Sequence, residues 1–401
     1  MRKHKVYTFA AVLALIAGNG TASAQNSLQD VLSGVERNNP SIKAALLELE
    51  AGEYGNRSEI MLDNPEFEFN YLLSPETGNR HDVRITQSLD FGLLSGQKSK
   101  LMAGRNELLA LEFKSERQEI LLEAELVCID LTYYNALCNE LEVHLSNAEQ
   151  LVSAYERKVS LGGASVLELN NVRLHRSTVK GQLMKAQVER AKLQKELERL
   201  NGNAPVEFSC DDMSKLSIVG SEAIDGDFES FFENMAELSP ALGYARQQIE
   251  VNKRQLGVDK TAWVPDLTVG YMSEITQPEA YRGLTFGISI PLWSNSSKVK
   301  QSRSQYAAAQ ARNNETVQAF RTALLNSYNE AVSLREISMD YRNSLEEADN
   351  RSFLIKAENQ GEISIIEYIT EMDLYYDNLG ETLSAEREYL QTLAGLTSVL
   401  L

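Results

Sequence analysis

Acidic side chains follow two breaks in otherwise helical stretches of this sequence. The stretch "ENQGEISIIEYITEM" places Glu367 and Glu371 shortly after a glycine, and "SLGGASVLELNN" places Glu168 in a matching position. Glu367 and Glu371 are four residues apart, so they would share one face of a helix. Carboxylates in such positions can accept hydrogen bonds from free backbone amides, or they can present negative charge to solvent and to ions.

The same order of residues follows both breaks. A glycine permits the turn that ends one helix, a serine provides the N-cap of the next, and a glutamate lies three residues after the serine, as in a capping box. These residues are Gly162, Gly163, Ser165 and Glu168 at the first break, and Gly361, Ser364 and Glu367 at the second. The sequence therefore predicts two helical hairpins with these glycines at their tips. A capping role by itself accounts for Glu168.

No catalytic or metal-binding motif accompanies these acids. The histidines and cysteines do not cluster in sequence, and they form no C-x-x-C or H-x-x-x-H motif. They are His4, His81, His144, His175, Cys128, Cys138 and Cys210. Cys128 and Cys138 would lie about 15 Å apart along one helix, which is too far for a disulfide. We expect no enzyme activity, no catalytic residues, no cofactor and no metal site.

Charge and the N-terminal segment limit the partners and the location of the protein. The chain has 401 residues and a formal net charge of −18, so nucleic acid is not an expected partner. Residues 1–24 predict a signal peptide, with a basic start, an apolar run at 6–17 and small residues at 22–24. We expect an exported chain that begins at Gln25, with an N-terminal membrane anchor as the alternative.

Four segments of alternating polarity predict strands. They are residues 66–73, 82–91, 266–275 and 283–292. Each has one apolar or aromatic face and is long enough to cross a membrane at a tilt. After residue 24 no apolar run reaches the roughly 20 residues of a membrane helix, so any later membrane span would consist of strands. A half-buried sheet in a soluble protein would show the same alternation, and this pattern leaves both interpretations open.

Matching motifs recur at an offset of about 200 residues, which predicts two similar halves. The motifs include Pro40 and Pro240, and Pro65 and Pro265. The predicted units are a first repeat at 25–200, a linker at 201–227 and a second repeat at 228–401. Each repeat would contain a helix, two strands, a long helix and a return helix. The predicted helices are 28–61, 96–160 and 165–200, then 228–263, 297–359 and 364–400, so that the hairpins span 96–200 and 297–400.

The long helices and the short sheet together imply an oligomer. A helix of about 60 residues is about 90 Å long and must pack sideways against other helices with heptad spacing. Four strands cannot close a membrane barrel, and open edges in lipid leave backbone groups unpaired. At least two chains must therefore share one barrel. Two copies would leave a barrel filled by side chains, whereas three would leave a lumen.

This plan resembles the TolC-like outer-membrane efflux ducts over essentially the whole chain after the signal peptide. The resemblance rests on the pairs Asn39-Pro40 and Ser239-Pro240, the "ISIPLW" strand end and the two G-x-x-S-x-x-E restarts. It implies a mainly α fold with a membrane β-barrel, in a homotrimer with a shared 12-strand barrel in outer-membrane lipid and a 12-helix periplasmic tunnel. The implied partners are a periplasmic adapter and an inner-membrane pump of a Gram-negative bacterium.

The resemblance also assigns roles at the two hairpin tips. The periplasmic aperture would be lined by Glu367, Glu371 and Glu168, although the second acid of the family falls at the position of Thr370. In a trimer these acids would form rings of carboxylates that favour cations. The tips that contact the adapter would be Leu161, Gly162, Gly163 and Ala164 in the first hairpin, and Gln360, Gly361, Glu362 and Ile363 in the second.

The predicted function is the outer-membrane channel of a tripartite efflux pump, and its acids suit cationic drugs or heavy-metal ions. The alternative is a secreted or periplasmic structural coiled-coil protein without channel activity. Outer-membrane trimers extracted in detergent would distinguish the channel from this alternative.

Overall fold

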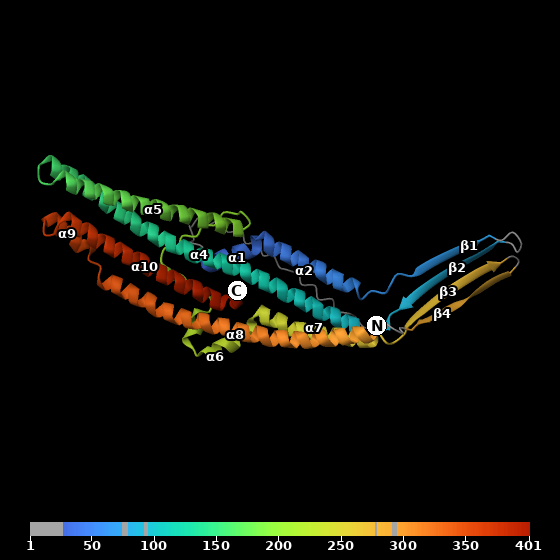
Figure 1. Ribbon diagram of the computed structural model, residues 1–401. Coiled ribbons are helices and arrows are strands. Elements are labelled where there is room, and N and C mark those ends of the chain that lie inside the picture. Colours follow the sequence, from blue (N-terminus) through green and yellow to red (C-terminus); the bar gives the residue numbers. More distant parts are fainter. Residues whose placement is uncertain (1–26, 74–78, 92–94, 277–278, 291–294) are drawn as a thin grey trace, which may run out of the picture.

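The chain forms a long, narrow rod with a sheet at one end and two helical tips at the other (Figure 1). The computed structural model describes residues 27–73, 79–91, 95–276, 279–290 and 295–401. The predicted signal peptide and the end of the "ISIPLW" motif, residues 291–293, lie outside the described residues. Most of the described chain is helical, which confirms the mainly α fold class.

Both halves of the chain present the same order of elements, except that the long helix of the second half is divided into two. The first half contains α1 (Leu28–Asn38), α2 (Pro40–Ser58), β1 (Glu66–Leu72), β2 (Arg80–Leu89), α4 (Gln97–Ser160) and α5 (Val166–Leu200). The second contains α6 (Phe228–Leu238), α7 (Pro240–Thr261), β3 (Asp266–Thr276), β4 (Glu279–Ser289), α8 (Asn295–Glu347), α9 (Arg351–Gln360) and α10 (Ile365–Thr397). None of the described helices has both the length and the apolar composition needed to cross a membrane.

The first helix of each half is split at an N-cap that precedes a proline. Asn39 separates α1 from α2, and its side-chain oxygen accepts hydrogen bonds from the N–H groups of Ser41 (2.8 Å) and Ile42 (3.1 Å). Ser239 separates α6 from α7 and accepts from the N–H of Leu242 (3.3 Å). The proline ring disfavours the helical conformation for the residue before it, because the two clash sterically. The prediction of continuous helices at 28–61 and 228–263 was therefore wrong.

The four strands form one antiparallel sheet in the order β1-β2-β3-β4. The central pair, β2 and β3, joins the two halves of the chain. One row of partners across the sheet consists of Phe67, Ile85, Tyr271 and Leu284. All four side chains are exposed, and Leu284 is 75% exposed. The sheet therefore presents an apolar face to its surroundings.

The opposite face of the sheet is polar. Glu68 pairs with Arg84 in the register of β1 and β2, and their side chains form a salt bridge of 3.2 Å. Asn70 and Asp82 are the next partners on this face, and their side chains are hydrogen-bonded at 3.1 Å. The outer strands β1 and β4 each have one neighbour in the sheet. Each outer strand thus leaves one backbone edge open for pairing.

The long helix predicted at 297–359 is interrupted, so that prediction was wrong. The helix α8 ends at Glu347, and α9 begins at Arg351. Asp349 and Asn350, between them, are weak helix formers. The Arg351 guanidinium donates a hydrogen bond of 2.9 Å to the carboxylate of Asp349. It also donates one of 2.9 Å to the carboxylate of Glu140, which lies on α4. This ion-pair network holds the break in place.

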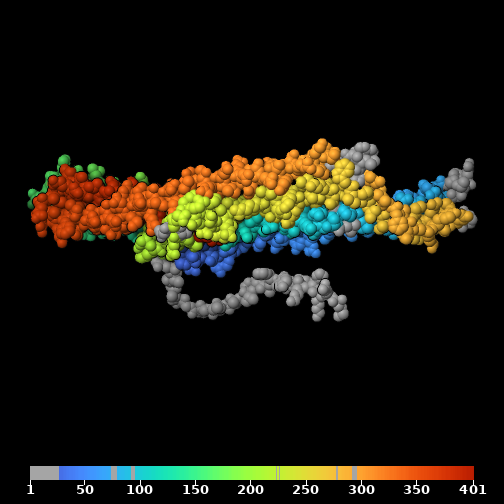
Figure 2. Space-filling view, turned by 90° about the horizontal axis from the view of Figure 1, so that it is seen from below, coloured from blue at the N-terminus to red at the C-terminus, as the bar shows by residue number. Residues whose placement is uncertain are grey.

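The largest apolar core lies at the middle of the rod and contains residues from α1, α4, α5, α6, α8 and α10. The segment 201–227, predicted to be a linker, contributes six buried residues to this core. They are Val206, Phe208, Met213, Leu216, Ile218 and Ile224. Figure 2 shows the yellow-green part of the chain, which follows this segment into α6, as a bulge at mid-length. The segment is therefore a packed part of the fold.

Candidate functional site

The second hairpin turns at Gly361, between α9 and α10. Gly361 has a φ of 75°, and its N–H donates to the carbonyl of Glu358 (3.0 Å). The N–H of Glu362 donates to the carbonyl of Ala357 (2.9 Å). These two bonds form a Schellman motif, which satisfies free carbonyl groups at the end of a helix. The first hairpin turns in the same way at Gly162, which has a φ of 73°.

A capping box starts the return helix at each tip. The Oγ atom of Ser364 accepts from the N–H of Glu367 (3.2 Å), and the carboxylate of Glu367 accepts from the N–H of Ser364 (2.8 Å). Ser165 and Glu168 form the same pair of bonds, at 3.1 Å and 2.6 Å. Hydrogen bonds from the serine backbone and side chain lower the pKa of both glutamates. Both carboxylates are thus held ionised beside the tips.

An ion pair between a buried carboxylate and a partly exposed ammonium group ties the two tips together. Glu358, in the last turn of α9, has a side chain that is 4% exposed. Its carboxylate accepts from the ammonium of Lys158 (2.7 Å) and from the hydroxyl of Tyr155 (2.9 Å), both on α4. The Lys158 ammonium also lies 4.5 Å from the centre of the Tyr155 ring. Sequence spacing does not point to Glu358, because its partners lie about 200 residues away in the chain.

An apolar cluster behind the tips joins α4, α5 and α10. Its buried members are Leu151, Val152, Tyr155, Leu169, Val172, Ile365, Tyr368 and Met372. Two of the predicted tip residues, Ala164 and Ile363, are partly buried against this cluster. Their side chains therefore help to fix the two tips against each other.

Other apolar side chains at the tips are exposed. Leu161 is 85% exposed. Leu167 and Ile366 are also exposed, and each lies two residues after the serine that caps its helix. A cluster of exposed apolar residues at the end of a rod is typical of a contact surface. Leu167 and Ile366 were not among the predicted site residues. The signal that could have found them is the repeated pair of apolar residues in "SVLE" and "SIIE".

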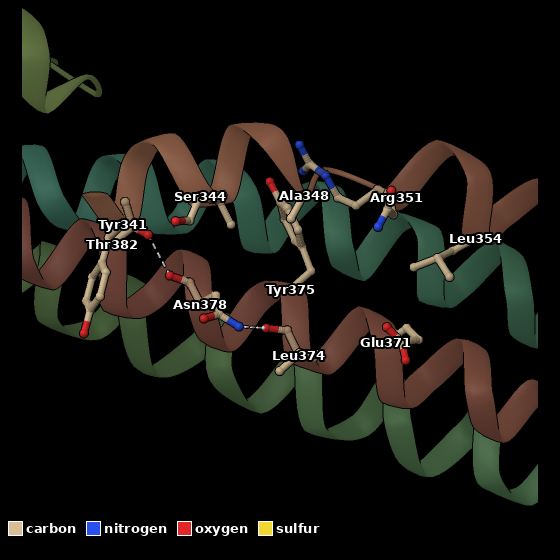
Figure 3. Close-up of a pocket in the computed structure, with 12 residues that line it drawn as sticks. Tyr341, Ser344, Ala348, Arg351, Leu354, Glu371, Leu374, Tyr375, Asn378 and Thr382 are labelled. Atoms are coloured by element: carbon tan, nitrogen blue, oxygen red, sulfur yellow. Dashed lines mark hydrogen bonds between the residues drawn. The ribbon is translucent and has the colours of Figure 1, made fainter. Parts of the chain in front are cut away.

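Glu371 lies in a different environment from Glu367. It lines a pocket between the α8–α9 break and α10. Glu371 lies near one end of this pocket, and Tyr341 and Thr382 lie at the other end (Figure 3). The Arg351 guanidinium lies 4.3 Å from the centre of the Tyr375 ring in the wall of this pocket. Glu371 is one turn past the capping box, so its carboxylate takes no part in the cap.

Solved structures share this arrangement over most of the chain. CusC, crystallised in a study of transmembrane channel formation, is 14% identical, with a TM-score of 0.74 over 94% of this chain and 92% of its own. The CmeC outer membrane channel of Campylobacter jejuni is 13% identical, with a TM-score of 0.74 over 93% and 85%. The outer membrane protein VceC of Vibrio cholerae is 12% identical, with a TM-score of 0.75 over 93% and 95%. This chain has the fold of the outer-membrane channels.

No sequence-family profile and no curated protein matches the chain. Within the outer-membrane channel fold, the predicted tip residues gather at one end of the rod, opposite the sheet (Figure 1). Glu168 and Glu367 occupy equivalent capping positions, and Glu371 lies apart from them in the pocket. The fold thus places the candidate contact surface and two of the three candidate acids, Glu168 and Glu367, at the same two tips.

Replacing Gly361 by alanine lowers the free energy of unfolding by about 1 kcal/mol, because a left-handed backbone is unfavourable for residues with a Cβ atom. Gly380 is the matched control. Both glycines have open space where a Cβ atom would lie, but Gly380 is inside α10 with ordinary helical geometry. Gly380→Ala therefore raises the free energy of unfolding by up to about 1 kcal/mol. Denaturant unfolding of the two variants measures both changes, and equal effects would contradict this account.

Proposed function

We propose that this chain is the outer-membrane channel of a tripartite efflux pump. Three chains would share one barrel in the outer membrane and one helical tunnel across the periplasm. A periplasmic adapter would bind the tips, and an inner-membrane pump would drive substrates into the tunnel. The protein would thus be located in the outer membrane of a Gram-negative bacterium.

The sheet is the observation that carries this proposal. Its exposed face bears an apolar row across all four strands, including Phe67 and Leu284, while the other face carries Glu68 and Arg84. In water such an exposed apolar face is unfavourable, whereas in lipid it is the stable arrangement. The edges of β1 and β4 leave backbone groups that lipid cannot satisfy. Pairing of β4 with β1 of the next copy would satisfy them and close a barrel.

The hairpin tips support the adapter as a partner. Leu161, Leu167 and Ile366 expose apolar surface at the end of the rod opposite the sheet. The two tips are tied by the Lys158–Glu358 pair, so they would present one surface to a partner. An amphipathic helical partner would bury these apolar side chains.

Membrane extraction and conductance test this function. We expect the protein in the outer-membrane fraction, as a trimer in detergent that dissociates on heating, and we expect discrete channels when it is added to a planar lipid bilayer. The alternative is a periplasmic structural coiled-coil protein. A monomer that is released without detergent and gives no conductance would support that alternative and exclude the channel.

The acids at the tips predict cation selectivity. In a trimer each acid would form a ring of three carboxylates that repel one another, and cations would relieve this repulsion. Replacing both Glu367 and Glu371 by glutamine is expected to reduce the cation preference, measured as the reversal potential across a salt gradient. The control replaces Glu381 and Glu388, which are exposed acids farther along α10. An unchanged reversal potential in the first variant would exclude the carboxylate ring.

A further inference from the structure

Two histidines and an aspartate from three helices meet in the tip half of the rod. His144 belongs to α4, His175 to α5 and Asp373 to α10. One potential ligand atom from each lies within 4.8 Å of the others. Spacing along the chain gave no hint of this cluster, because each residue lies on a different helix.

The His144 ring is buried and has polar atoms without partners. The residue is 2% exposed, and neither of its ring nitrogens has a hydrogen-bond partner among the described residues. A buried polar group without a partner is unfavourable. The Tyr376 ring stacks on the imidazole, with 3.7 Å between ring centres and 4° between planes. His144 is therefore held in a fixed orientation with a nitrogen lone pair available.

The other two side chains complete a set of ligands. The His175 ring centre lies 5.1 Å from that of His144, and the His175 side chain is 4% exposed. Nδ1 of His175 is 3.4 Å from a carboxylate oxygen of Asp373, which is long for a hydrogen bond. The Asp373 side chain is 53% exposed and lies on the solvent side of the cluster. Asp373 supplies a negative charge, and an ion can reach the cluster from the solvent on this side.

We propose that His144, His175 and Asp373 form a binding site for a divalent transition-metal ion of the zinc type. Two imidazole nitrogens and one carboxylate oxygen suit zinc, with a water molecule as the fourth ligand. Ligand atoms around a tetrahedral zinc ion are about 3.3 Å apart, so the three side chains need to approach by no more than about 1.5 Å. Magnesium and calcium prefer oxygen ligands and do not suit this set.

The bound ion would be a resident of the protein and not its cargo. Both imidazoles are buried between helices, so an ion held by them is not free to move along a tunnel. It would link α4 and α5 of the first hairpin to α10 of the second. Such a link would stabilise the packing of the two hairpins, because ligands that bind only the folded state shift unfolding to higher temperature.

Zinc titration of the full chain tests this site. The protein is purified in detergent with an affinity tag that contains no histidine, stripped with a chelator, and titrated with zinc ions alone in a calorimeter. We expect about one zinc ion per chain, no displacement by excess magnesium, and a higher thermal unfolding temperature with zinc. Replacement of zinc by cobalt is expected to give the visible absorption of a tetrahedral site with nitrogen and oxygen ligands.

Two matched variants distinguish the site from surface charge. Asp373→Asn is expected to weaken zinc binding by at least about tenfold and to remove the thermal shift, because it removes a ligand. Asp377→Asn, one turn farther along α10, removes the same charge from an exposed residue and is expected to bind zinc like the unmodified protein. Both positions are exposed, so both variants are expected to fold. No zinc uptake by the unmodified protein, or equal losses in the two variants, would overturn the proposal.

Discussion

Replacing Glu125 by glutamine stabilises the protein by about 3 kcal/mol at pH 8 and by less than about 1 kcal/mol at pH 5. Glu125 lies in α4 beside the central core and is 1% exposed. Its Oε1 atom has no hydrogen-bond partner among the described residues. Burial raises the pKa of this carboxyl from 4.5 to about 7. Glutamine has a similar shape and carries no charge at any pH.

The sign of this pH dependence follows from proton binding. The folded chain holds the Glu125 proton more tightly than the unfolded chain does, so the neutral carboxyl favours the folded state. This contribution is complete below about pH 4.5 and is lost as the pH rises through about 7. The rise in pKa from 4.5 to about 7 corresponds to about 3 kcal/mol. The glutamine variant does not lose this stability.

Denaturant unfolding at several pH values, followed by helical circular dichroism, measures the effect. Glu119→Gln is the control, because Glu119 is an exposed carboxylate on the same helix. That variant is expected to remain within about 0.5 kcal/mol of the unmodified protein at both pH values. If the stability of the Glu125→Gln variant changes with pH in parallel with that of the unmodified protein, the raised pKa of Glu125 is excluded.

Replacing Lys158 by methionine is expected to lower the free energy of local opening at the hairpin tips by about 3 kcal/mol. The substitution leaves the carboxylate of Glu358 buried, with the Tyr155 hydroxyl as its remaining hydrogen-bond donor in the described structure. Removing one partner of a buried ion pair is unfavourable by about 3–5 kcal/mol. We place the effect at the low end of this range because Lys158 is 38% exposed. Hydrogen exchange of the α9 amides measures the local opening.

The two partners of this pair are not equivalent. Glu358→Gln is expected to lower the free energy of local opening by only about 1 kcal/mol, because the freed ammonium of Lys158 can reach water. The double variant Lys158→Met/Glu358→Gln is expected to recover part of the loss, because it buries no unpaired charge. A double variant that is no more stable than Lys158→Met alone would exclude this explanation.

An exposed pair near the same tips provides the control. Arg173 and Glu156 also approach to 2.7 Å, but their side chains are 48% and 49% exposed. Arg173→Met is expected to cost less than about 1 kcal/mol, because exposed ion pairs contribute little. In the proposed channel, only the Lys158 variant would separate the tips, and it is expected to increase the open time in single-channel recordings.

Local sequence signals determined the type of most elements and the starts of the two return helices. The capping boxes at Ser165 and Ser364 connect residues three apart, so spacing alone is sufficient to predict them. Alternation of polarity located the four strands, because side chains on a strand point to opposite faces in turn. The proline after Asn39 is also a local signal for a helix break, and the structure has the break at this position. These features depend on neighbours in the chain, and the mainly α fold follows from them.

The tertiary structure alone decided the features that join distant segments. Burial of Glu358 and Glu125, the cluster of His144 with His175, and the packed segment 201–227 all depend on which helices lie side by side. A glutamate in a helical pattern has the same local sequence signal whether its face meets solvent or another helix. Side-chain pairing across the two hairpins is long-range and has no fixed spacing. Only the packed chain determines which polar groups lose water and need a partner.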